Sequence, residues 1–81
     1  MWNNQGHSIA FTLKEPTIIR ILAPVHRHLE YELFLNQDFG PYSHKTLIRG
    51  KREDHHIGIF AQLSAGDYHL KIAFSSDAAL L

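Results

Sequence analysis

The 81-residue sequence contains no cysteine, and this absence excludes both a disulfide scaffold and any zinc site built from thiolates. It carries no excess of charge either, because eight basic residues balance eight acidic ones. General binders of nucleic acids or anionic membranes depend on a basic excess, so we expect no nucleic-acid partner. No apolar run approaches the length of about 20 residues that a membrane-spanning helix requires. We therefore expect no membrane span.

Length and composition predict one small globular domain. Hydrophobic residues make up 44% of the chain and charged residues 20%, which differs from the low hydrophobicity and high net charge of disordered chains. We expect residues 1–81 to form a single domain excised from a longer protein. The lack of disulfides is compatible with a reducing compartment such as the cytoplasm, and with an exported protein that does without disulfides. Localisation therefore stays open.

What the sequence does contain is apolar alternation with the period of a strand that buries one face. Six segments alternate in this way or are rich in β-branched residues, namely residues 8–14, 17–22, 29–35, 46–49, 57–63 and 68–74. A further edge strand over 77–81 would make seven. Residues 29–35 alone are compatible with a helix, but their alternation is strict and their neighbours are strands. We predict an all-β fold, a small antiparallel β-sandwich of about six to eight strands.

The connections and the core follow from the same pattern. Gly66 permits a positive φ in the stretch 64–67, which predicts a β-hairpin between residues 57–63 and 68–74. Loops are expected over 23–28, 36–45 and 50–56, with Pro24 ending a strand ladder because it lacks a backbone donor. The predicted core consists of the apolar residues on one face of each strand: Ile9, Phe11, Leu13, Ile19, Ile21, Leu29, Tyr31, Leu33, Leu35, Ile57, Ile59, Leu63, Tyr68, Leu70, Ile72 and Phe74.

The order of the strand motifs resembles small β-sandwiches attached to peptidases. Residues 31–35 (Tyr-Glu-Leu-Phe-Leu) and 63–72 (Leu-Ser-Ala-Gly-Asp-Tyr-His-Leu-Lys-Ile), with residues 11–13 and 18–22 before them, are similar to the bacterial pre-peptidase C-terminal domain. Residues 14–21 (Lys-Glu-Pro-Thr-Ile-Ile-Arg-Ile) resemble a turn and strand of the C2-like domain of calpains. This resemblance implies a non-catalytic accessory module whose catalytic centre lies elsewhere in a longer chain.

Aromatic residues at expected exposed positions predict a contact surface. Phe34 and Phe60 fall on the outward register of their strands, Phe39 and Tyr42 lie in the loop 36–45, and Trp2 is near the N-terminus. Exposed aromatics are enriched where proteins bind partners or sugars. We therefore expect this surface to bind a protein partner, a neighbouring domain or a glycan. The alternative is that the loop or a neighbouring domain covers Phe34 and Phe60.

The seven histidines suggest a second kind of site. His26 and His28 are two residues apart in one expected loop, and His55 and His56 lie beside Asp54 in another. Neutral imidazole is the commonest metal ligand among side chains, so the two loops could together bind zinc. The spacing matches no established ligand motif, and the alternative is that these histidines are solvated loop residues. The oligomeric state also stays open, because the edge strand 46–49 could pair with another chain.

The carboxylates give no clear sign of catalysis. Glu30 and Glu32 lie about 7 Å apart along one strand, a spacing that would suit an inverting glycosidase. Alternating glutamates are also typical of a solvated sheet face, and no Gly-x-Ser-x-Gly motif is present. In the accessory domains that this chain resembles, aspartates that sometimes bind calcium occupy these positions, and the glutamates speak against calcium. We expect no enzyme, and no cofactor unless zinc or calcium binds.

Overall fold

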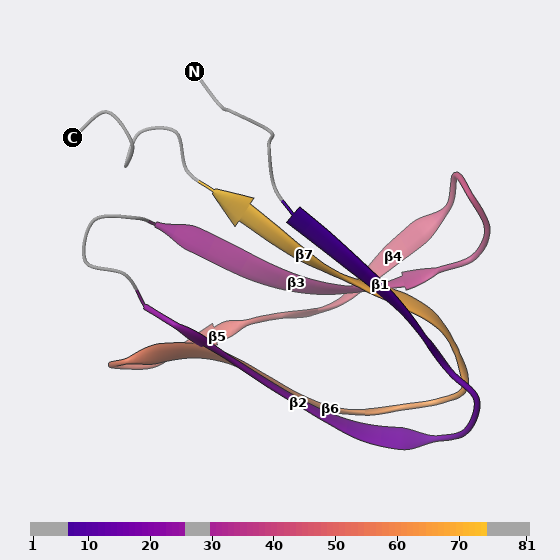
Figure 1. Ribbon diagram of the computed structural model, residues 1–81, viewed down its shortest axis with the longest axis horizontal. Coiled ribbons are helices and arrows are strands. Elements are labelled where there is room, and N and C mark those ends of the chain that lie inside the picture. The colour runs from indigo at the N-terminus through magenta and orange to yellow at the C-terminus, as the bar shows by residue number, and fades with distance from the viewer. Residues whose placement is uncertain (1–6, 26–29, 75–81) are drawn as a thin grey trace.

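The computed structural model describes residues 7–25 and 30–74, and within them it shows seven β-strands in two antiparallel sheets (Figure 1). Sheet A has four strands in the order β1 (His7–Leu13), β7 (Gly66–Phe74), β3 (Tyr31–Asp38) and β4 (His44–Arg49). Sheet B has three strands in the order β2 (Thr17–Pro24), β6 (His56–Leu63) and β5 (Lys51–Arg52). The predicted all-β fold is confirmed. The described part of the chain holds no helix of the length and hydrophobicity needed to cross a membrane.

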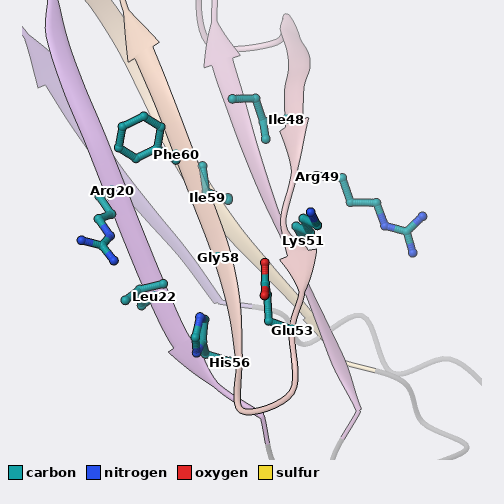
Figure 2. A pocket seen from close by; sticks show the side chains of 10 residues that line it. All are labelled: Arg20, Leu22, Ile48, Arg49, Lys51, Glu53, His56, Gly58, Ile59 and Phe60. Atoms are coloured by element: carbon teal, nitrogen blue, oxygen red, sulfur yellow. The ribbon is translucent and has the colours of Figure 1, made fainter.

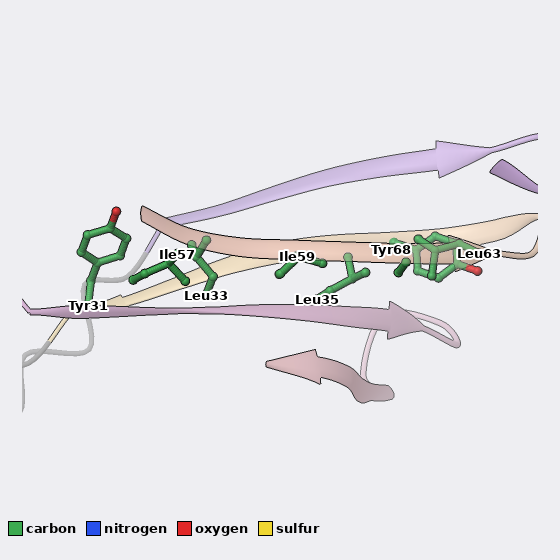
Figure 3. Close-up of a cluster of buried hydrophobic side chains, with 8 residues drawn as sticks. Tyr31, Leu33, Leu35, Ile57, Ile59, Leu63 and Tyr68 are labelled. Atoms are coloured by element: carbon green, nitrogen blue, oxygen red, sulfur yellow. The ribbon is translucent and has the colours of Figure 1, made fainter. Parts of the chain in front are cut away.

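The core lies between the two sheets, where β3 of sheet A faces β6 of sheet B (Figure 3). Alternate residues of a strand point to opposite faces, and the odd-numbered side chains of β3 and β6 point inward. The buried cluster is Tyr31, Leu33, Leu35, Ile57, Ile59, Ala61, Leu63 and Tyr68. Seven further predicted core residues pack against it as partly buried side chains: Phe11, Leu13, Ile19, Ile21, Leu70, Ile72 and Phe74.

One predicted core residue is wrong. Ile9 is 58% exposed although it shares a face of β1 with Phe11 and Leu13. Within the described residues its strand pairs with β7 alone and forms an edge of sheet A, so a side chain there has a neighbouring strand on one side. Leu29, also predicted in the core, lies outside the described residues, as does the expected strand over 77–81.

The predicted hairpin between residues 57–63 and 68–74 is also wrong, although both strands exist. β6 belongs to sheet B and pairs with β2, whereas β7 belongs to sheet A and pairs with β1 and β3. The connection therefore crosses from one sheet to the other. Gly66 at a φ of 156° provides the turn, and the buried Tyr68 donates a hydrogen bond of 2.7 Å from its hydroxyl to the carbonyl oxygen of Ser64. This bond closes the connection over the end of the core.

We expect Tyr68→Phe to destabilise the fold by about 0.5–1.5 kcal/mol, because it removes this hydrogen bond but keeps the buried ring. Urea unfolding monitored by circular dichroism measures the difference in the free energy of unfolding. Tyr42→Phe is the matched control, since Tyr42 is 98% exposed and should tolerate the change without effect. Equal stability of the two variants would contradict a structural role for the Tyr68 hydroxyl.

A single segment serves both sheets. β4 pairs with β3 in sheet A, and two residues later β5 pairs with β6 in sheet B. Gly50 stands between the two strands, and its backbone N–H donates to the carbonyl oxygen of Leu33 at 2.8 Å. A strand that leaves one sheet for the other forms a corner of the sandwich. This corner limits how far β5 extends along β6.

Several expected loops are partly strand. Asn36, Gln37 and Asp38 extend β3, and His44 and Lys45 begin β4, so the expected loop over 36–45 shortens to a turn over 39–43. The pairing of β3 with β4 shifts between Leu35 and Asn36, where Leu47 of β4 is skipped, while β3 stays in unbroken register with β7 through Asp38. Pro24 is the last residue of β2 and pairs with His56, and the segment 50–56 contains β5.

Candidate functional site

The outer face of sheet B carries three of the five exposed large apolar side chains of the described strands. Ile18 and Leu22 point outward from β2, and Phe60 points outward from β6 with 74% of its surface exposed. In the β2–β6 ladder Arg20 stands opposite Phe60 and Leu22 stands opposite Gly58. These side chains share one face because outward positions recur at every second residue. We call Ile18, Arg20, Leu22 and Phe60 the sheet B face.

A groove of about 580 Å³ runs beside this face (Figure 2). Its lining comes from four strands: β2 contributes Leu22 and β6 contributes Ile59 and Phe60, while Ile48 comes from β4 and Lys51 from β5. The groove forms because β5 covers only a short length of β6 before the chain turns at Gly50 toward sheet A. Its volume falls within the range of about 300–1,000 Å³ that is usual for ligand sites.

The edge of β6 is open along this groove. β2 pairs with all eight residues of β6, but on the other side β5 pairs only with Ile57 and Gly58. Among the residues that the structure describes, no strand pairs with this second edge from Ile59 to Leu63. Unpaired backbone groups of an edge strand are a template for pairing with another chain.

Positive charge predominates around the groove. Arg20, Arg49 and Lys51 line it together with one carboxylate, Glu53. Arg49 forms an ion pair with Glu32, whose side chain is about half exposed. Within residues 7–25 and 30–74, neither Arg20 nor Lys51 forms an ion pair. With Arg49 paired, the groove combines an apolar wall with two cations and one carboxylate, so its small positive excess can attract an anionic group.

The structure separates the aromatic residues predicted to form one contact surface. Phe34 is half-buried on the outer face of sheet A, where it pairs with Arg49 and Lys71, whereas Phe60 lies on the outer face of sheet B. Phe39 and Tyr42 are exposed in the turn between β3 and β4. Trp2 lies outside the described residues. Of the four aromatics that the structure describes, Phe60 alone lines the groove.

The predicted histidine site is only partly visible. His26 and His28 lie outside the described residues, while His55 is exposed in the turn before β6 and His56 is the half-buried first residue of β6. The backbone N–H of Val25 donates to the carbonyl oxygen of His55 at 3.1 Å, so the end of β2 lies next to this turn. No three His, Asp or Glu side chains among the described residues are grouped to hold a metal ion. The four-histidine zinc site stays a prediction.

The two predicted carboxylates have different surroundings. Glu32 accepts a hydrogen bond from the guanidinium of Arg49 across the β3–β4 pair, which occupies one of its oxygens. Glu30 is exposed just before β3. The ion pair accounts for Glu32 as part of a polar sheet face, in keeping with ordinary alternation on an antiparallel sheet.

The outer face of sheet A carries a polar network that the sequence does not predict. His69 on β7 lies between two residues of β3, with its Nδ1 2.7 Å from Asp38 Oδ1 and its Nε2 2.8 Å from Asn36 Nδ2. The Asn36 side chain is buried, and its Oδ1 has no hydrogen-bond partner within the described part of the chain. In the sequence, Asn36 and Asp38 continue the outward register of Phe34, although the polar composition of 36–45 predicts a loop.

Comparison with known proteins finds no family model, no curated protein and no solved structure that matches this chain.

Proposed function

We propose that this chain is a non-catalytic interaction module that binds a protein partner through the sheet B face. The observation that carries the proposal is Phe60, a large aromatic side chain that is three-quarters exposed beside a groove and an open strand edge. Aromatic residues in the middle of such patches contribute most of the binding energy in many interfaces. Scattered single apolar residues need no explanation, but Ile18 and Leu22 flank Arg20 on β2, and each is a diagonal neighbour of Phe60, which stands opposite Arg20.

A protein partner suits this face better than a glycan does. Sugar hydroxyls need hydrogen-bonding groups when they are taken out of water. The outward positions of β2 and β6 combine the apolar side chains of Ile18, Leu22 and Phe60 with only three that can form hydrogen bonds, those of Arg20, His56 and Gln62. The resemblance to peptidase-associated sandwiches supports an accessory role in a larger protein, in which the partner is either a separate protein or a neighbouring domain.

We expect Phe60→Ser to weaken partner binding by about tenfold or more, because truncating a central aromatic residue commonly costs an interface 2 kcal/mol or more. The immobilised 81-residue chain and its variant are exposed to the same cell extract, and quantitative mass spectrometry compares the proteins they retain. Tyr42→Ser is the control, because Tyr42 is an exposed aromatic in the turn before β4, whereas the groove lies at the end of that strand.

Proteins retained equally by the native chain and Phe60→Ser would contradict the proposed function. Thermal unfolding of both variants accompanies the measurement. Because Phe60 points into solvent, its variant should melt close to the native chain, within the small change of about 0.5 kcal/mol typical of surface substitutions. Loss of the fold would show that Phe60 has a structural role instead.

A further inference from the structure

We infer that the groove binds an extended, acidic segment of the partner, which adds a strand to the open edge of β6. The inference rests on the proposed function and specifies the chemistry of its ligand. Strand addition to a sheet edge is an established mode of peptide recognition, in which main-chain hydrogen bonds supply affinity and alternate side chains supply specificity.

Two hydrogen bonds show which backbone groups of β6 face the open edge. The carbonyl oxygen of His56 accepts from the N–H of Glu53 on the β5 side, while that of His55 accepts from Val25 on the β2 side. In an antiparallel strand the N–H and C=O of one residue point to the same edge, and those of the next residue point to the opposite edge. The backbone groups of Phe60 and Gln62 therefore point toward the unpaired edge, where an incoming strand would meet them.

The side chains around the groove define the alternation expected in the ligand. A strand placed beside β6 would turn one set of side chains toward Ile48 and Ile59, which line the inner wall. Its other set would lie on the outer face, in line with Lys51 and within reach of Arg20. The matching segment alternates apolar and acidic residues. The open edge from Ile59 to Leu63 would accommodate about 17 Å of extended chain, or roughly five residues.

The β2 edge of sheet B fits such a ligand less well. β2 presents an edge of sheet B, but Pro24 lies in it and has no N–H to donate. The groove and its cations lie at the opposite edge, beside β6. A second copy of the chain is disfavoured there, because two-fold pairing would bring the unpaired cations of both copies together at one interface.

Selection from a library of random dodecapeptides displayed on phage tests the inference with the 81-residue chain as bait. Enriched peptides should alternate apolar and acidic residues. Synthetic versions should bind the native chain, and should bind Lys51→Glu about tenfold more weakly, because the substitution reverses a charge at the interface. Lys71→Glu is the matched control, since Lys71 is an exposed cation on the outer face of sheet A.

N-methylation of alternate backbone nitrogens provides the second measurement. It removes the N–H donors that a pairing strand must present, and should abolish binding when placed on the edge that faces β6. Unchanged affinity after methylation of either edge would overturn strand addition.

The other outcomes are equally decisive. Enriched peptides that lack acidic residues, or that bind Lys51→Glu as tightly as the native chain, would overturn the acidic ligand. If those same peptides fail to bind Phe60→Ser, the proposed function would still stand. Failure to enrich any peptide would overturn an extended peptide ligand. A dimer in sedimentation velocity that dissociates on Phe60→Ser would identify a second copy as the occupant instead. Binding that is indifferent to Phe60→Ser would contradict the proposed function itself.

Discussion

Leu35→Ala should lower the free energy of unfolding by about 2–5 kcal/mol, the largest effect that we expect from a single substitution in this chain. Leu35 is fully buried in the middle of β3 and belongs to the cluster that joins the two sheets. Truncation removes its apolar contacts and leaves a cavity that the surrounding strands can only partly fill. A domain of this length has a total stability of roughly 4–12 kcal/mol, so this loss is a large fraction of the whole.

Urea unfolding at low temperature measures this effect, and two variants control for it. Leu22→Ala removes the same atoms from an exposed leucine on the sheet B face and should change stability by about 0.5 kcal/mol or less. Leu35→Met keeps the buried volume and should cost less than about 1.5 kcal/mol. Similar stability of Leu35→Ala and Leu22→Ala would contradict the position of Leu35 between the sheets.

Gly50→Ala should destabilise the fold by about 1–3 kcal/mol, the cost of overpacking a close-fitted site. A Cβ atom at Gly50 would lie 2.7 Å from Cγ2 of Ile57 and 3.1 Å from Cβ of Leu33. Both neighbours are buried in the core, so neither can move aside without disturbing the packing between the sheets. The same position carries the chain from β4 to β5, and its N–H pairs with Leu33.

Gly58→Ala is the matched control for this substitution. A Cβ at Gly58 would come within 3.3 Å of Cδ2 of Leu22, the end of an exposed side chain that can rotate away. Replacing glycine in an extended strand also restricts the unfolded chain, which stabilises by about 0.4–1 kcal/mol where the native conformation allows it. Equal denaturation midpoints for Gly50→Ala and Gly58→Ala would show that the corner at Gly50 has more space than the structure indicates.

The candidate site shows how unevenly the sequence constrains function. Phe60 was identified from its outward register alone, because alternation places it between the buried Ile59 and Ala61. Its grouping with Phe34 depended on the arrangement of the two sheets, and the structure places these two residues on opposite outer faces. The groove could not be foreseen, since it depends on where β5 stops covering β6.

The polar residues of sheet A illustrate the same limit. Asn36 and Asp38 were assigned to a loop because polar residues and a nearby Gly40 are typical of turns. In the fold these two residues extend β3. Asn36 pairs with His69 of β7, and the side chains of Asn36 and Asp38 both contact the His69 ring. Only a partner that lies 33 residues away in the chain makes a buried asparagine acceptable at this position.

By itself the sequence determined the all-β class, most of the strands and the face that β2, β3, β6 and β7 bury. Period-two alternation is a local property of the chain. A strand that turned its apolar face outward would expose apolar surface, whichever strand it paired with. Only the tertiary structure decided which strands pair, because pairing depends on contacts between distant segments. Two neighbouring strands with a glycine turn between them fit a hairpin and a crossing between sheets equally well. The strand pairing places β6 and β7 in different sheets, carries the chain from one sheet to the other at Gly50 and leaves the edge of β6 open.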